Sequence, residues 1–209
     1  KKGNNHHVIF FVDEVGQYIG ENTDKLELCA SHGICTKEAL QKLADAGVLT
    51  YHHNLESSRR FYPNVCTSHT YDDRINTIKN AKAVGLDVCS GGIFGLGETI
   101  EDRIDMALDL RELEICSVPI NVLTPIPGTP FENNEAVEPL EILKTISIYR
   151  FIMPETYLRY GGGRIKLGDY VKTGLRCGIN SALTGNFLTT TGTTIEKDKK
   201  MIEELGYEL

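Results

Sequence analysis

Short apolar runs alternate with longer amphipathic segments along almost the whole chain. Seven of these runs have the length and residue types of buried β-strands, and they occupy residues 7–12, 25–29, 48–54, 86–90, 117–123, 156–160 and 179–185. Helical periodicity follows most of them, in residues 36–47, 70–85, 99–113, 139–153 and 193–206. The pattern predicts a repeated strand–helix unit.

Several of the predicted helices open with capping signals. Thr70 and Asp73 have the spacing of a capping box, and so do Thr99 and Asp102. Thr36 is a typical N-cap for the segment that follows it. These signals support the helical assignment independently of the apolar pattern.

The predicted connections between strands are helical, which indicates parallel pairing and right-handed crossovers. Seven units fit either an open doubly wound sheet or most of a (β/α)8 barrel. No G-x-G-x-x-G follows the first strand, so a dinucleotide-binding fold has no support. No linker or internal repeat interrupts the chain, and we expect one domain over residues 1–209.

The bulk composition narrows the partners and the compartment. Acidic and basic residues are mixed along the chain, and the net charge of −7 argues against nucleic acid as a partner. No apolar run approaches the ~20 residues that span a bilayer, and the first residues lack a signal-peptide pattern. The six cysteines are scattered, which favours reduced thiols over a disulfide framework. We therefore expect a cytoplasmic protein without membrane contact.

Polar side chains stand at the ends of several predicted strands. Cys29 and Cys89 end two of them, and Asn121 and Arg159 stand in two others. Each has an ordinary explanation: a core cysteine, a turn-capping asparagine, or an arginine paired with a buried carboxylate. Together they indicate polar groups around one cavity, on the face where parallel α/β folds carry their active sites.

Two further features near these strands are ambiguous. His52 and His53 are adjacent, so the alternation of side chains along a strand predicts that they do not both line one site. The stretch DVCSGGIFGLGET, residues 87–99, follows Cys89 with four glycines. These glycines either shape a turn or allow backbone to approach a flat ligand.

The chain resembles the biotin synthase family of radical S-adenosylmethionine (SAM) enzymes over about residues 26–209. The motifs that carry the resemblance are YHHNLESS, TYDDR, DVCSGGIFGLGET, SVPINVLTPIPGTP, YLRYGGGR and GNFLTTTGTTIEKDKKMIEELG, in this order. The resemblance implies a (β/α)8 TIM-type barrel, here incomplete with about seven parallel strands. It also implies a [4Fe–4S] cluster that cleaves SAM reductively and a [2Fe–2S] cluster that supplies sulfur. The implied reaction converts dethiobiotin to biotin.

The resemblance assigns metal ligands residue by residue. Cys29 and Cys89 match two thiolate ligands of the sulfur-donating [2Fe–2S] cluster, and Arg159 matches its arginine ligand. Cys89 and Arg159 are thereby also the candidate catalytic residues. The remaining cysteines are expected to lie outside the cavity; they are Cys35, Cys66, Cys116 and Cys177.

Further matches concern SAM and the substrate. Asn54 and Glu56 match positions that hold the SAM ribose, although the family often has Asp where Glu56 stands. Arg74 matches a position near the SAM carboxylate, and Ile93 matches backbone along the adenine. Asn54 and Asn121 match contacts to the ureido ring of dethiobiotin.

The chain also departs from the family pattern. The C-x3-C-x2-C spacing that holds the [4Fe–4S] cluster does not occur, and the strand at residues 7–12 carries no thiol. By element order, that strand corresponds to the second strand of the barrel, so the first strand is expected to be missing. The chain thus resembles the C-terminal two-thirds of the family, as a fragment, a split-gene product or a degenerate copy.

The resemblance implies an electron donor such as flavodoxin or ferredoxin and a homodimer. An alternative is a non-catalytic domain that retains only the SAM and dethiobiotin pockets. A third reading, an aldolase-like barrel, requires a Schiff-base lysine at a strand end, and no predicted strand carries one inside.

Overall fold

The computed structural model describes residues 9–12, 28–184 and 193–207. Within them, all strand pairs belong to one parallel sheet of order β1-β8-β7-β6-β4-β3-β2, with β5 paired to β6. The strands are β1 Ile9–Val12, β2 Cys29–Ala30, β3 Thr50–His52, β4 Asp87–Cys89, β5 Gly92–Phe94, β6 Ser117–Val122, β7 Tyr157–Tyr160 and β8 Ser181–Thr184.

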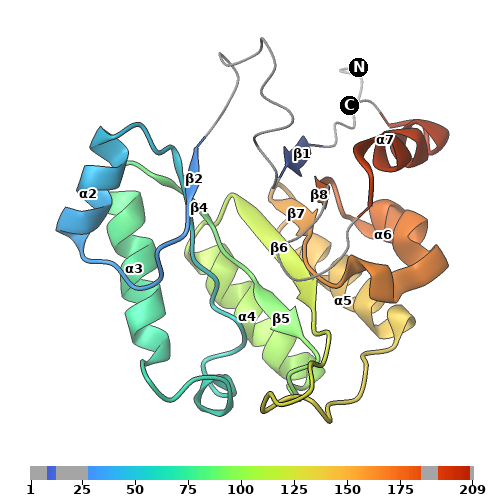
Figure 1. Cartoon of the computed structure of the whole chain (residues 1–209), viewed down its shortest axis with the longest axis horizontal. Coiled ribbons are helices and arrows are strands. Elements are labelled where there is room, and N and C mark those ends of the chain that lie inside the picture. The colour runs from blue at the N-terminus through green and yellow to red at the C-terminus, as the bar shows by residue number, and fades with distance from the viewer. Residues whose placement is uncertain (1–8, 13–27, 185–192, 208–209) are drawn as a thin grey trace.

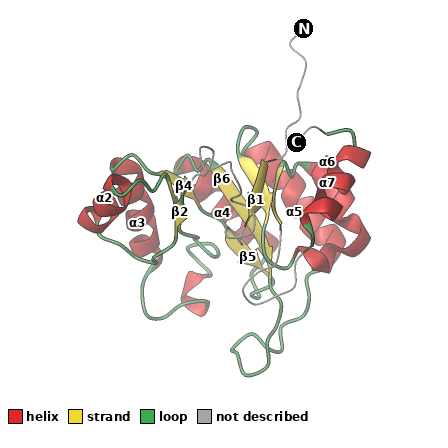
Figure 2. Cartoon of the chain, turned by 45° about the horizontal axis from the view of Figure 1, so that its top comes forward, coloured by secondary structure: helices red, strands yellow, loops and turns green. Residues whose placement is uncertain are grey.

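The helices succeed one another around this sheet, with α2 and α3 at one end, α4 and α5 behind the middle strands, and α6 and α7 at the other end (Figure 1). When the molecule is turned, the strands still lie between α2 and α3 on one side and α6 and α7 on the other (Figure 2). The α-helices are α2 Lys37–Asp45, α3 Tyr71–Ala83, α4 Ile100–Glu112, α5 Pro139–Ile152, α6 Val171–Cys177 and α7 Ile195–Glu204, and 3₁₀ turns occupy Tyr62–Asn64 and Arg164–Tyr170. No helix in the described ranges is long and apolar enough to cross a membrane.

This architecture is the incomplete (β/α)8 barrel that the sequence predicts, but the position of the opening differs. We expected the first strand of the chain to lie beside the second, with the gap between the first and the last. Instead β1 pairs with β8, from Ile9 opposite Ser181 to Val12 opposite Thr184. All four residues of β1 have a partner on β8, so the pairing uses the full length of both strands. Among the described strands, the opening therefore lies between β1 and β2.

The predicted helix starts are confirmed in detail. Thr70 and Thr99 each accept a bond from the backbone N–H three residues on, and Asp73 and Asp102 bond back to the cap residues. Thr36 caps α2 through its hydroxyl. The strand predicted at 25–29 begins at Cys29 among the described residues, and residues 25–27 lie outside them.

The two faces of the sheet have different chemistry. Side chains directed at the helices are apolar and buried; they include Tyr51, Val88, Val118 and Leu158. The alternate positions point to the inner side of the curved sheet. The strand register lays His52 beside Cys89, Cys89 beside Ser117, and Arg159 beside Ser181 on that side. The fold thus buries an apolar core outside the strands and collects polar groups inside them.

Candidate functional site

The inner face brings Cys89, Arg159 and His52 together from three different strands. Arg159 Nη2 donates to Cys89 Sγ at 2.8 Å, although the two residues are 70 positions apart in the chain. His52 Nδ1 lies 3.3 Å from the same sulfur. Cys89 is only 1% exposed and Arg159 only 9%. A buried thiol between two nitrogen groups differs from the ordinary core cysteine, which contacts apolar neighbours.

Electrostatics around this sulfur follow from burial and from the guanidinium. Burial raises the pKa of Cys89 to about 11, with Arg159 opposing the rise. Burial also lowers the pKa of His52 to about 4, and Arg159 lowers it further. Without a bound metal, the thiol is therefore protonated and the imidazole neutral near pH 7. Metal ligation at Cys89 releases a proton, as expected for a thiolate ligand.

Cys29 belongs to the same electrostatic environment from a neighbouring strand. Cys29 is exposed on the edge strand β2. Partial desolvation nevertheless raises the pKa of its thiol, and the charge of Arg159 opposes that rise. A charge on Cys29 would in turn raise the pKa of Cys89. Two thiols therefore lie within electrostatic reach of one guanidinium. Among the described residues, no three His, Cys, Asp or Glu side chains converge closely enough to form a ready-made metal site.

A second cluster lies where β3 ends. Arg74 Nη1 donates to the Asn54 carbonyl oxygen at 2.7 Å and lies 3.7 Å from Glu56 Oε1. Asn54 Nδ2 donates to Glu56 Oε2 at 3.4 Å. Burial raises the pKa of Glu56, and Arg74 and Asn54 oppose that rise. These residues line a cavity of about 250 Å³ together with Ser31, Gly33, Ile34, His52, His53 and His69.

The presence of both histidines around this cavity corrects the sequence prediction that they do not share a site. Strict alternation holds only within a strand, and β3 ends at His52. Beyond it the chain bends, and Glu56 has a left-handed φ of 70°, which is uncommon for a residue with a side chain. His53 is 4% exposed, and in the described part of the chain its Nε2 has no hydrogen-bond partner.

Asn54 and Asn121 meet at the turn formed by Gly91 and Gly92. Gly91 N donates to Asn54 Oδ1 at 3.0 Å, and Asn121 Nδ2 donates to the Gly92 carbonyl oxygen at 3.0 Å. Asn121 Oδ1 also accepts a bond from Gly162 N at 2.9 Å. The two amides thus brace glycine turns, and each keeps one N–H and one oxygen lone pair unused in these bonds.

The glycines at this turn are required by close packing. A Cβ on Gly92 would lie 2.5 Å from Met106 Sδ and 2.6 Å from the Glu56 carbonyl oxygen, and one on Gly91 would collide with the Pro119 carbonyl oxygen. The turn runs directly into β5, which the sequence pattern did not predict as a strand. In β5, Ile93 pairs with Asn121 on β6, and its N–H donates to the Glu56 carbonyl oxygen at 2.9 Å. The backbone of Ile93 therefore connects Asn121 on β6 with Glu56 of the second cluster.

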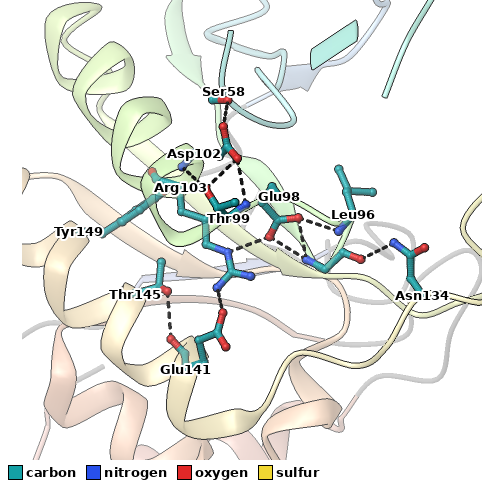
Figure 3. A network of polar contacts seen from close by, with 11 residues as sticks. Ser58, Leu96, Glu98, Thr99, Asp102, Arg103, Asn134, Glu141, Thr145 and Tyr149 are labelled. Atoms are coloured by element: carbon teal, nitrogen blue, oxygen red, sulfur yellow. Dashed lines mark hydrogen bonds and ion pairs between the residues drawn. The ribbon is translucent and has the colours of Figure 1, made fainter. Parts of the chain in front are cut away.

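The carboxylate that closes the glycine-rich stretch has a structural role that the sequence prediction missed. Glu98 accepts bonds from Gly95 N at 2.9 Å and Leu96 N at 2.7 Å, so it fixes the turn (Figure 3). Arg103 Nε donates to Glu98 Oε1 at 2.7 Å, and Arg103 Nη1 donates to Glu141 Oε1 at 2.6 Å. A carboxylate following G-x-G, with an arginine five residues on, is the signal that could have indicated it.

Of the five residues predicted to share one cavity, Asn54 lines this cavity, whereas Cys29, Cys89, Asn121 and Arg159 do not. The remaining cysteines do not line it either. Cys35 Sγ accepts a bond from the Tyr51 hydroxyl, Cys116 Sγ donates to the Val88 carbonyl oxygen, and Cys177 packs against the core. Cys66 Sγ lies 3.5 Å from the ring of His69, which does line it. Cys66 is therefore nearer to the site than the sequence suggested.

Two family models match the chain, one after the other. Residues 7–110 match the radical SAM superfamily, and residues 119–208 match the Biotin and Thiamin Synthesis associated domain. The chain is similar to the biotin synthase of Fusobacterium nucleatum subsp. nucleatum, with 89% identity over 196 residues, covering 94% of this chain and 54% of that protein. It is 60% identical to the biotin synthase of Campylobacter hominis, over 88% of this chain and 56% of that protein.

Solved structures agree on the fold. The crystal structure of methylornithine synthase (PylB) covers 99% of this chain with a TM-score of 0.75 at 20% identity, and the match takes in 69% of that chain. The maturase HydG of the [FeFe]-hydrogenase covers 87% with a TM-score of 0.73 at 18% identity, over 44% of that chain. The chain spans about half the length of the curated relatives it matches. By the match of residues 7–110 to the family model and by its curated relatives, the chain belongs to the radical SAM superfamily, within which it resembles the biotin synthases.

Proposed function

We propose that this chain provides the substrate-binding and sulfur-donating part of a biotin synthase, which converts dethiobiotin to biotin. The observation that carries the proposal is the contact between Arg159 and the buried Cys89 sulfur at 2.8 Å. The 89% identity to a named biotin synthase gives the reaction to test. The Arg159 guanidinium would stabilise the thiolate that Cys89 becomes when it ligates a metal.

Cys29, Cys89 and Arg159 would hold a [2Fe–2S] cluster. Thiolates are the usual ligands of such clusters, and the guanidinium offsets their negative charge in a buried site. When bound, this cluster would supply sulfur, while a [4Fe–4S] cluster would supply the electron that cleaves SAM. The protein residues position these groups and exclude water from them.

The cavity at the end of β3 would bind SAM. Arg74 offers a cation for the amino-acid carboxylate, and Glu56 and Asn54 offer acceptors for ribose hydroxyls. The N–H of Ile93 bonds to the Glu56 carbonyl oxygen, so the Ile93 backbone borders this cavity where a flat base can pack. Because Glu56 is longer than the Asp common in the family, we expect its carboxylate to reach the ribose with a different side-chain conformation.

Asn54 and Asn121 would bind the ureido ring of dethiobiotin. A cyclic urea offers N–H donors and one carbonyl acceptor. Each amide, once engaged with the glycine turn, retains one N–H donor and one oxygen lone pair. The remaining groups therefore complement the urea without breaking the bonds that hold Gly91 and Gly92.

Other parts of the proposal rest on family resemblance alone. The sequence contains no C-x3-C-x2-C spacing, so the three thiolates that hold the [4Fe–4S] cluster in the family have no counterpart in this chain. We propose an electron donor such as flavodoxin or ferredoxin, a homodimer, and a cytoplasmic location.

The test is reconstitution of the purified chain with iron and sulfide, followed by dithionite, SAM and dethiobiotin. Assembly of a cluster with thiolate-to-iron absorption that disappears in Cys89→Ala and persists in Cys177→Ala supports the sulfur-donating site. An equal spectrum in both variants would contradict it. Biotin formation, measured by mass spectrometry, is not expected from this chain alone, because the spacing that holds the [4Fe–4S] cluster is absent. Its detection would contradict that part of the proposal.

The absence of the three-cysteine spacing favours a second candidate, a domain that binds SAM and dethiobiotin without cleaving SAM. Calorimetry measures the binding of each ligand, and chromatography measures 5′-deoxyadenosine. Neither candidate predicts 5′-deoxyadenosine from this chain alone, because the spacing that holds the [4Fe–4S] cluster is absent. Binding of both ligands without a cluster that depends on Cys89 supports the second candidate, and a cluster that is lost in Cys89→Ala rules it out.

A further inference from the structure

His52 lines the cavity proposed for SAM without an assigned ligand contact, and it also contacts the sulfur of Cys89. The strand register pairs His52 with Cys89, so both side chains leave neighbouring strands on the inner face. His52 Nδ1 lies 3.3 Å from Cys89 Sγ, within the range of a hydrogen bond to sulfur. Neighbouring strands hold their backbones at a fixed spacing, so this contact is built into the sheet.

Arg159 and His52 approach the Cys89 sulfur from opposite sides of β4. Arg159 Nη2 is 2.8 Å from the same sulfur and comes from β7, whereas His52 comes from β3 on the other side of β4. The sulfur therefore has a nitrogen neighbour from each of two separate strands. A thiolate that ligates iron has no proton and can only accept hydrogen bonds. In the ligated state, the imidazole can therefore contribute only by presenting Nδ1–H to the sulfur.

We propose that His52 is a positioning residue that donates an N–H···S hydrogen bond to Cys89 and thereby sets the reduction potential of the cluster on that sulfur. The inference rests on the proposed function, because it requires Cys89 to act as a ligand. Hydrogen bonds to ligand sulfurs stabilise the more negatively charged, reduced cluster, which raises its potential. The same bond restrains the rotation of the Cys89 side chain.

Two substitutions separate this role from simple space filling. His52→Leu keeps a side chain of comparable bulk but removes the N–H donor. His52→Asn keeps an amide N–H close to the position of Nδ1. His32→Asn is the matched control, because His32 is an exposed histidine three residues from Cys29 and does not line the cavity.

The first measurement is the midpoint potential of the [2Fe–2S] cluster in the reconstituted chain, by dye-mediated titration with visible and EPR detection. We expect a shift to more negative potential in His52→Leu, a value near the wild type in His52→Asn, and no shift in His32→Asn. A loss of stability alone would leave the potential of the assembled cluster unchanged.

The second measurement uses Co²⁺ alone, which needs no sulfide. Thiolate-to-Co²⁺ charge transfer reports the electron density on the sulfur. We expect the band to move to longer wavelength in His52→Leu and to stay in place in His52→Asn. Equal bands and equal potentials in all variants that load through Cys89 would overturn the role of His52 and leave the proposed function intact. If Cys89→Ala instead takes up both probes as the wild type does, the proposed function is overturned, and the role of His52 with it.

Discussion

Arg103 and Glu98 form an ion pair of 2.7 Å in which the two side chains are 3% and 2% exposed. The pair lies directly beneath the turn that leads from β5 into α4, and Glu141 on α5 extends it to the next helix. Arg103 on α4 thus links the glycine-rich turn, through Glu98, to α5, through Glu141.

Removing one partner of this pair should be strongly destabilising. Glu98→Gln removes the buried carboxylate of the pair and leaves the guanidinium with the half-exposed Glu141, and we expect a loss of about 3 kcal/mol in the free energy of unfolding. Urea denaturation followed by circular dichroism measures it. The double variant Glu98→Gln/Arg103→Met should lose less than the sum of the two single variants. Strict additivity would show that the two side chains do not interact.

Gly91 should not tolerate a methyl group. Gly91→Ala places a Cβ against the Pro119 carbonyl oxygen, which belongs to β6 and cannot move without the sheet. We expect a loss of about 1–3 kcal/mol, typical of overpacking. Gly162→Ala is the control, since its Cβ would meet only Asn121 Oδ1 at an ordinary 3.6 Å. Similar thermal midpoints for the two variants would contradict the packing argument.

Arg74→Lys should weaken SAM binding while leaving the fold intact. The guanidinium contacts the Tyr62 hydroxyl, the Asn54 carbonyl and the His69 ring at once, and a lysine cannot reproduce these contacts. Loss of one charge-assisted bond costs about 1.5–3 kcal/mol, or about tenfold to a hundredfold in Kd. Titration calorimetry with SAM measures this. Arg59→Lys, at an exposed pair with Asp72, should bind as the wild type does.

Asp102 should make the fold sensitive to acid. Burial alone would raise the pKa of its carboxyl, but bonds from Ser58, Thr99 and Arg60 outweigh burial and hold the pKa at about 2. The folded pKa is below the unfolded value, so the stabilisation is present above about pH 4 and is lost as pH falls toward 2. A shift of about two units corresponds to at most ~2–3 kcal/mol. Asp102→Asn should flatten the fall in urea stability between pH 4 and 2.5. An unchanged slope would assign the acid sensitivity to other carboxylates.

Local signals in the sequence predicted local structure well. The capping boxes at Thr70 and Thr99 depend on residues three positions apart, so both partners are visible in one short window. Parallel pairing followed from repeated strand–helix alternation, and the choice of a barrel over an open doubly wound sheet followed from the family resemblance. The convergence of Cys89 and Arg159 followed from the polar ends of strands together with the family resemblance.

Features that depend on distant residues were missed. β5 is a strand because β6 offers its partner backbone, although its first residue is glycine. Glu98 and Arg103 are close in sequence, but Glu141 is 38 positions beyond Arg103. The placement of β1 depends on which edge of the sheet can pair, and no property of residues 9–12 reveals that.

The turn at Gly91 and Gly92 is held by Asn54 from the cavity side and by Asn121 from the β6 side. One short piece of backbone is therefore bonded to residues of both proposed ligand sites. A ligand that orders this backbone from one site lowers the ordering cost for a ligand at the other, which is positive cooperativity without a change of fold. Linkage requires the effect to be reciprocal. The Kd of SAM should thus fall in the presence of dethiobiotin by the same factor as the Kd of dethiobiotin falls in the presence of SAM, and Asn121→Ala should bring that factor toward one.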